Sequence, residues 1–246
     1  DYATAVGYEN RATGDWASTF GKANYASYKS VALGIGNNAN GNQSVAVGYS
    51  NNATATDTTA LGRATTASAT AATAVGRDSK ATGDYALAVG YLNNANTNAT
   101  AVGYDNDATA LRTTALGYSN NAIGDYSAAL GYNNDTASNN STAVGSSNEA
   151  TGSQSTALGY TNQATATATT AVGYDNDATG EKATAVGYQN TANTYSTAVG
   201  YNNTASANNA TALGRSNTAS STSATAVGYS NEATATQGTA VGYNNK

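Results

Sequence analysis

Small and larger residues alternate over short stretches that recur along the whole chain. One copy of the pattern is Thr170-Ala171-Val172-Gly173-Tyr174. With the glycine taken as position 0, positions −4 and −2 hold small residues, whereas −3 and −1 mostly hold Thr and then Val or Leu. Because successive side chains of a strand point to opposite faces, each stretch is predicted to be a β-strand with one face of small residues.

The glycine of this pattern recurs with a nearly fixed period. Of the 17 intervals between the 18 repeat glycines, 14 are 14 residues long and three are 13. Such a period is typical of a solenoid. A second corner is predicted near position +7, where glycine recurs at Gly14, Gly41, Gly83, Gly124, Gly152 and Gly180. The expected fold is an all-β parallel β-solenoid of about 18 coils, with two short strands per coil and essentially no helix. We expect residues 1–246 to form a single repetitive domain, as a section of a longer fibrous chain.

The three 13-residue intervals end at Gly34, Gly103 and Gly200. Comparison of a short coil with a full one places the missing residue at the second corner, which also varies most in residue type. Loops on the surface tolerate such length changes. We therefore predict that the second corner is exposed and that the strands keep their register through the short coils.

A coil of 14 residues encloses only a thin interior, which the small face and the Ala at +5 are expected to fill. The Val or Leu at −1 then points outward, as a stripe longer than a soluble monomer usually exposes. Another copy of the chain is the simplest cover, so a closed homo-oligomer is expected. The predicted interface residues are Val47, Val89, Val102, Leu116, Leu158, Val172, Val186 and Val199.

Asparagine occupies position +3 in 16 of the 18 coils. Stacked Asn amides bond to one another along a repetitive array, and Asn tolerates left-handed backbone in turns. A structural role is therefore predicted for this row. We expect the row to lie on the surface, with Asn176 and Asn190 exposed and tolerant of substitution.

Tyrosine follows the glycine in 12 coils, and arginine does so in three, at Arg63, Arg77 and Arg215. The Tyr row could grip a collagen-like, carbohydrate or mineral surface, but a stacked structural ladder is the favoured interpretation. A second, irregular aromatic set lies at position −5 and begins with Tyr2. Its other members are the candidate surface-contact residues Trp16, Tyr85, Tyr126 and Tyr195.

Composition restricts the possible chemistry. The chain has no Cys or His, which excludes thiol chemistry and histidine acid–base catalysis and argues against a zinc site. The net charge is −5 and the ten Lys and Arg residues are scattered, so nucleic acid is not an expected partner. Asp105-Asn106-Asp107 and Asp175-Asn176-Asp177 lack the spacing of a calcium loop. No cofactor, metal, catalytic residue or membrane contact is expected, and the protein is interpreted as a non-enzyme.

The repeat resembles the head repeat of trimeric autotransporter adhesins of the YadA type. The residues that carry the resemblance are Ser30-Val31-Ala32-Leu33-Gly34 and Ser44-Val45-Ala46-Val47-Gly48, with Ala12-Thr13-Gly14 and Ala150-Thr151-Gly152 as the downstream element. The resemblance implies a left-handed parallel β-roll, three chains packed side by side, and attachment outside the cell. This chain differs in having Thr at −3 in most coils and an unusually regular Tyr row.

Two classes of function remain open. The first is an extracellular or surface-attached oligomeric rod that adheres or builds a fibre, as an adhesin or as the shaft of a phage or appendage fibre. Its partners would be further copies of the chain and a host matrix, carbohydrate or surface ligand. The second is ice binding by the Thr array at −3. Oligomer mass separates the two, because a face buried in an oligomer is not available to ice.

Overall fold

A computed structural model describes residues 2–246. The chain divides into two compact units, residues 1–123 (unit 1) and 124–246 (unit 2). Within residues 2–246 the secondary structure consists of strands and turns, with no helix. The predicted all-β architecture is therefore confirmed.

Each coil of unit 1 contains a long strand of five residues and a short strand of two. The long strands are β1 (Thr4–Tyr8), β3 (Ser18–Lys22), β5 (Val31–Ile35), β7 (Val45–Tyr49), β9 (Thr59–Arg63), β11 (Thr73–Arg77), β13 (Leu87–Tyr91), β15 (Thr100–Tyr104) and β17 (Thr114–Tyr118). The short strands are β2 (Arg11–Ala12), β4 (Tyr25–Ala26), β6 (Asn38–Ala39), β8 (Asn52–Ala53), β10 (Thr66–Ala67), β12 (Lys80–Ala81), β14 (Asn94–Ala95), β16 (Asp107–Ala108) and β18 (Asn121–Ala122).

Unit 2 repeats this design. Its long strands are β19 (Ala128–Tyr132), β21 (Thr142–Ser146), β22 (Thr156–Tyr160), β24 (Thr170–Tyr174), β26 (Thr184–Tyr188), β28 (Thr197–Tyr201), β30 (Thr211–Arg215), β32 (Thr225–Tyr229) and β34 (Thr239–Tyr243). Its short strands are β20 (Asp135–Thr136), β23 (Gln163–Ala164), β25 (Asp177–Ala178), β27 (Thr191–Ala192), β29 (Thr204–Ala205), β31 (Thr218–Ala219) and β33 (Glu232–Ala233). Between β20 and β23, Glu149 makes an isolated bridge to each neighbour instead of a strand.

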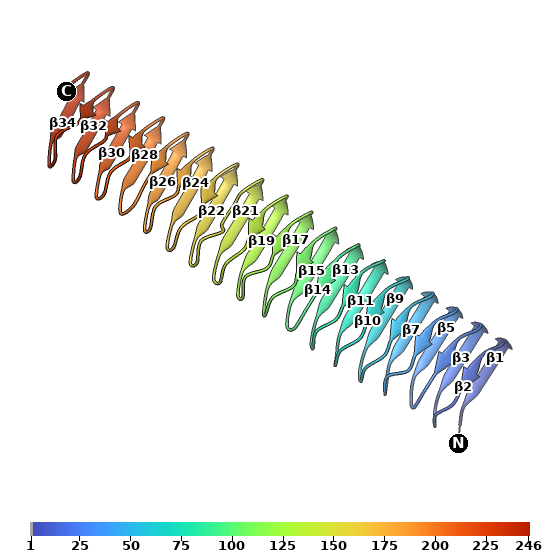
Figure 1. The fold of residues 1–246 in the computed structure, drawn as a ribbon. Helices are drawn as coiled ribbons and strands as arrows, with labels where there is room; N and C mark the ends of the chain where they lie inside the picture. Colours follow the sequence, from blue (N-terminus) through green and yellow to red (C-terminus); the bar gives the residue numbers. More distant parts are fainter. Residues whose placement is uncertain (1) are drawn as a thin grey trace. The chain divides into compact units, whose positions relative to one another are not determined.

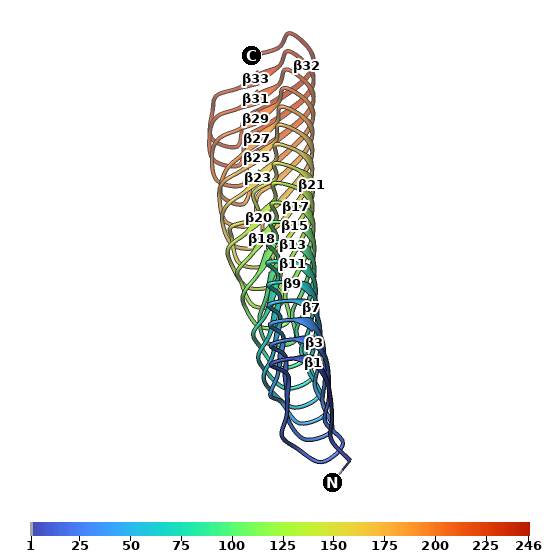
Figure 2. The same cartoon turned by 90° about the vertical axis from the view of Figure 1, so that its right-hand side faces the viewer.

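Successive coils stack in parallel within each unit (Figure 1), with the long strands along one side and the short strands along the other (Figure 2). Equivalent residues pair, so Thr170 lies beside Thr184 and Gly173 beside Gly187. The predicted parallel β-solenoid with two strands per coil is thus confirmed.

The short coils keep this register, as predicted. Gly21 pairs with Gly34 although only 13 residues separate them, and Gly187 likewise pairs with Gly200. The full first coil has four residues, 13–16, between the +5 Ala and position −4, whereas the next coil has three, 27–29. The missing residue is absorbed at the second corner because the strand phrase on either side keeps its length.

The interior is lined mainly by alanine, together with serine and threonine. From Ala26 onward, the Ala residues at −2 and at +5 are buried, as Ala171 and Ala178 illustrate with 0% exposure. The small residues at −4, such as Ser155 and Thr169, are buried beside them. The prediction that the small face points inward is confirmed, and Thr at −3 and Val or Leu at −1 face outward.

Each coil turns with three left-handed residues. Gly173 has φ +123°, and a Cβ there would lie 2.0 Å from the carbonyl oxygen of Gly187, so only glycine fits. The residues at +2 and −5 also have positive φ although most are not glycine, as at Asp175 (54°) and Ala168 (58°). The first corner was predicted from its glycine, whereas the non-glycine positions had no comparable signal in the sequence.

Candidate interaction surface

The outward face of the long strands carries three parallel rows, formed by positions −3, −1 and +1. Most of the −1 residues are half-buried in the single chain because Val or Leu side chains in register flank them, as Leu158 and Val186 flank Val172. All eight predicted interface residues have this half-buried environment: Val47, Val89, Val102, Leu116, Leu158, Val172, Val186 and Val199. They point away from the alanine interior, and their role as a subunit interface stays a prediction.

The same face is most apolar near the start of unit 1. Along β5, Val31 takes the place of the usual Thr at −3, and Ile35 takes the place of the usual Tyr at +1. Leu33 lies between them at −1, where Val or Leu is usual. The exposures of Val31, Leu33 and Ile35 are 36%, 45% and 49%. Phe20 lies beside Leu33 in register and is 39% exposed. The apolar row is therefore widened here to the full breadth of the strand.

The Tyr row forms the stacked ladder that the sequence predicted. Tyr160, Tyr174, Tyr188 and Tyr201 stack successively, with ring centroids 5.1, 4.9 and 5.0 Å apart. Stacked aromatic pairs at this spacing add about 0.5–1.5 kcal/mol beyond their buried area. Because each ring is still 37% to 47% exposed, the row supports the fold and also presents hydroxyl groups to solvent.

The second aromatic set lies at the second corner. Trp16, Tyr85, Tyr126 and Tyr195 all adopt left-handed backbone there, and they are 57%, 66%, 50% and 45% exposed. Trp16 contacts the ring of Tyr2 at a centroid distance of 4.6 Å. The structure thus places the four residues at equivalent, outward positions in different coils, and their role as contact residues stays a prediction.

The Asn row is not on the surface, and the expected exposure of Asn176 and Asn190 is wrong. Both residues have 0% exposure. The Nδ2 of Asn176 donates to Oδ1 of Asn162 (2.9 Å), the carbonyl of Val172 (3.1 Å) and the carbonyl of Gly187 (2.8 Å). Its Oδ1 accepts from the backbone nitrogen and Nδ2 of Asn190. The amide is buried because it fills the first corner and satisfies backbone groups that water cannot reach.

The predicted stacking of the Asn amides along the coils is confirmed, but the residues at +3 are not the left-handed ones. That conformation belongs to position +2. The near-invariance of Asn was the available signal for burial, since an exposed row would vary as much as position +4, where Asn, Thr, Lys, Asp, Glu and Gln all occur.

The two Asp-Asn-Asp stretches each centre on a residue of the buried Asn row, Asn106 or Asn176. No group of three or more His, Cys, Asp or Glu residues among the described residues is placed to hold an ion. The amide nitrogens of Asn106 and Asn176 are engaged in the Asn row. Burial, together with the neighbouring carboxylate of Asp175, raises the pKa of Asp177.

A search of residues 2–246 for a helix of the length and hydropathy that a membrane span requires found none.

The model of the YadA head domain repeat, which spans two copies, matches most of the chain. The matched segments are residues 28–51, 53–79, 67–93, 95–120, 122–148, 150–176, 178–194, 193–217 and 219–245. No curated protein matched the chain.

Proposed function

Because the chain belongs to the family of YadA head domain repeats, we propose that it is the head or shaft of an extracellular homotrimeric adhesin or fibre. In this proposal residues 1–246 act as one repetitive domain of a longer chain. The protein has no catalytic role and presents its Tyr and Thr rows on a cell or appendage surface. The family match gives no support to the ice-binding alternative.

The observation that carries the proposal is the half-buried −1 row on the outer face of the long strands. Burying a Val or Leu side chain completely contributes roughly 1.5–3 kcal/mol. Burying the remaining half in each coil of unit 2 would yield a sum comparable with the roughly 5–15 kcal/mol stability of a whole domain. Exposure of such a row to water is unfavourable, and two further copies of the chain would bury it against apolar side chains.

A matched pair of double variants tests the interface. Leu158→Asp with Val172→Asp places charges in the −1 row of two adjacent coils. In a trimer, six carboxylates would then lie in a poorly hydrated interface, so dissociation or aggregation is expected. The control, Gln154→Asp with Ala168→Asp, adds the same charges at position −5 of the same coils, a position that holds Asp57 in another coil.

Sedimentation velocity of the wild type and both variants gives the oligomeric state. The expected result is a trimer for the wild type and the control, and loss of the trimer for the −1 variant. A monomeric wild-type chain, or a −1 variant that stays trimeric while the control dissociates, would contradict the proposed interface.

A further inference from the structure

Two adjacent coils of unit 1 interrupt the Tyr row with arginine. Tyr49, Arg63, Arg77 and Tyr91 are successive register partners at position +1 of β7, β9, β11 and β13. All four positions lie at the end of a long strand, next to the first corner. They therefore lie at the margin of the face whose centre is the −1 row.

Each guanidinium group stacks on the tyrosine at its outer side. The Cζ of Arg63 lies 5.8 Å from the ring centroid of Tyr49, and the Cζ of Arg77 lies 5.2 Å from that of Tyr91. On its inner side, each arginine has the other as its register partner. Like charges directly opposite each other in a sheet are unfavourable, so an anion that contacts both groups would relieve the repulsion.

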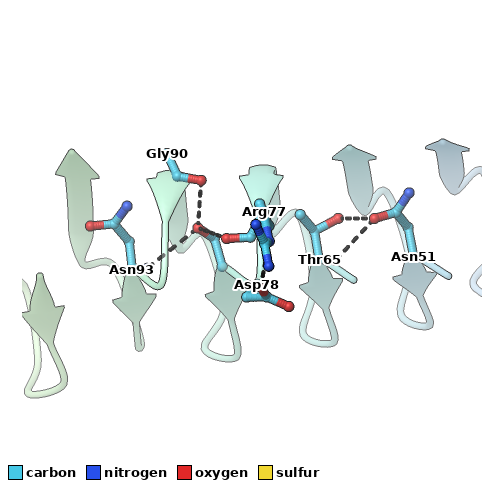
Figure 3. Close-up of polar contacts among 7 residues, drawn as sticks. Asn51, Thr65, Arg77, Asp78, Gly90 and Asn93 are labelled. Atoms are coloured by element: carbon cyan, nitrogen blue, oxygen red, sulfur yellow. Dashed lines mark hydrogen bonds and ion pairs between the residues drawn. The ribbon is translucent and has the colours of Figure 1, made fainter. Parts of the chain in front are cut away.

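The charges near this pair are not balanced. The Nε of Arg77 pairs with Oδ2 of Asp78 at 3.1 Å (Figure 3), which leaves the terminal nitrogens of Arg77 available. Among residues 2–246, Arg63 has no ion-pair partner. The pair of guanidinium groups thus has one ion-paired carboxylate, in contrast to the negative net charge of the whole chain.

The third arginine of the row provides an internal contrast. Arg215 is a single interruption, and its Cζ lies 5.3 Å from the ring centroid of Tyr201 and 5.4 Å from that of Tyr229. Both faces of this guanidinium are therefore covered by aromatic rings. The paired arginines each have one face that lacks a ring, and those two faces adjoin.

The same two coils also lack the Asn amide beneath the row. Thr65 donates to Oδ1 of Asn51 at 2.6 Å, and Ser79 donates to the carbonyl of Gly90 at 3.1 Å (Figure 3). Within residues 2–246, no side-chain hydrogen bond joins Thr65 to Ser79. A ligand that bridges Arg63 and Arg77 would thus link two coils that have fewer side-chain bonds than their neighbours, and its binding would stabilise the folded state.

We propose that Arg63 and Arg77, with Tyr49 and Tyr91 on either side, bind the carboxylate of an acidic sugar. A carboxylate has two oxygens, one for each guanidinium, and arginine recognises planar carboxylates through paired hydrogen bonds. The tyrosines supply hydroxyl groups and ring edges for the sugar, since guanidinium groups cover the ring faces that adjoin the pair. The inference names a ligand class for the proposed adhesive surface and rests on that proposed function. The acidic chain disfavours densely charged polyanions, so a ligand with one anionic group is expected.

The test measures binding of 3′-sialyllactose to the intact protein by NMR titration. The control ligands are lactose, which lacks the acidic group, and acetate, which lacks the sugar. Binding of sialyllactose well above that of both controls is expected. Arg63→Gln with Arg77→Gln should weaken it at least about tenfold, which corresponds to the loss of one charge-assisted contact. Arg215→Gln is the matched control and should leave it unchanged.

Two further variants keep the result interpretable. Arg63→Tyr with Arg77→Tyr continues the row of neighbouring coils, so it should fold while losing binding. Asp78→Asn removes the competing carboxylate and should strengthen binding. The proposal is overturned if sialyllactose does not bind, if acetate binds equally well, or if Arg215→Gln weakens binding as much as the double variant. Sedimentation of the same samples separates a failed site from a failed trimer.

Discussion

Units 1 and 2 share one backbone design and differ in how completely their side chains stack. In unit 2 the Asn row is continuous, with each amide bonded to the next from Asn134 to Asn245. In unit 1 the row is interrupted at Thr65 and Ser79, and the Tyr row is interrupted in the same two coils. The strands at the interruption nevertheless keep their register, with Ala60 beside Ala74.

The difference indicates which interactions determine the fold and which add to its stability. Both units share the long-strand ladder and an interior made mainly of alanine, and these persist where the Asn and Tyr rows do not. The side-chain rows can therefore vary in places, which permits a local arrangement such as the Arg63–Arg77 pair without a change in backbone.

The largest loss of stability is expected from a substitution that destabilises the two units equally. Ala74→Leu in unit 1 and Ala171→Leu in unit 2 force a larger side chain between two closely packed sheets. Overpacking of a core typically costs about 1–3 kcal/mol and occasionally more, and we expect the upper end or beyond because the surrounding residues are backbone and alanine. Chemical denaturation should show a similar loss for both, and a tolerated Leu in either unit would contradict the thin interior.

Breaking the Asn row of unit 2 should have the next largest effect. Asn176→Ala removes the hydrogen bonds of one amide and leaves the carbonyls of Val172 and Gly187 without that donor. We expect a loss of about 3 kcal/mol, since each buried group left unsatisfied costs about 1–3 kcal/mol. Thermal unfolding measures this, and exposed Gln189 changed to Ala is the control. Equal melting temperatures for the two variants would mean that the buried row contributes little.

Completing the row in unit 1 is the converse experiment. Thr65→Asn with Ser79→Asn should link Asn51 to Asn93 through two new amides and stabilise the protein by about 1–2 kcal/mol, a net gain of about one hydrogen bond per coil. This gain in stability is smaller than the loss expected for Asn176→Ala because Thr65 and Ser79 already form some hydrogen bonds at the first corner. A rise in melting temperature would support this, whereas a fall would mean that the two corners differ in shape from the rest.

The smallest effect should come from Asp177→Asn. The pKa of Asp177 is raised by burial and by Asp175, so the folded state holds the proton more tightly than the unfolded state. The carboxylate therefore destabilises the fold at neutral pH, and this cost disappears as pH falls below its unfolded pKa. Unfolding at neutral and acid pH should show a stabilised variant only at neutral pH. A difference that grows toward acid pH would have the wrong sign.

The strand phrase, the period and the small interior could be predicted from the sequence because backbone alternation and coil length determine them directly. The burial of Asn176 and Asn190 could not, since Asn is usually a surface residue and only the regularity of the row indicated otherwise. The left-handed residues at +2, such as Asp175, had no signal as strong as glycine. Whether Val172 is covered by another chain depends on assembly, which lies outside the geometry of one chain.

The Asn row also has a direction. Each Nδ2 donates to the Oδ1 of the coil that precedes it, as Asn190 does to Asn176 and Asn203 to Asn190. Hydrogen bonds aligned head to tail polarise one another. A folded coil therefore presents a hydrogen-bond acceptor to the coil that follows it. Folding can then propagate from the N-terminal side, which is the direction in which a polypeptide is synthesised. This series of side-chain hydrogen bonds stops at Thr65, which donates to Asn51, and begins again at Ser79, which accepts from the backbone nitrogen of Asn93.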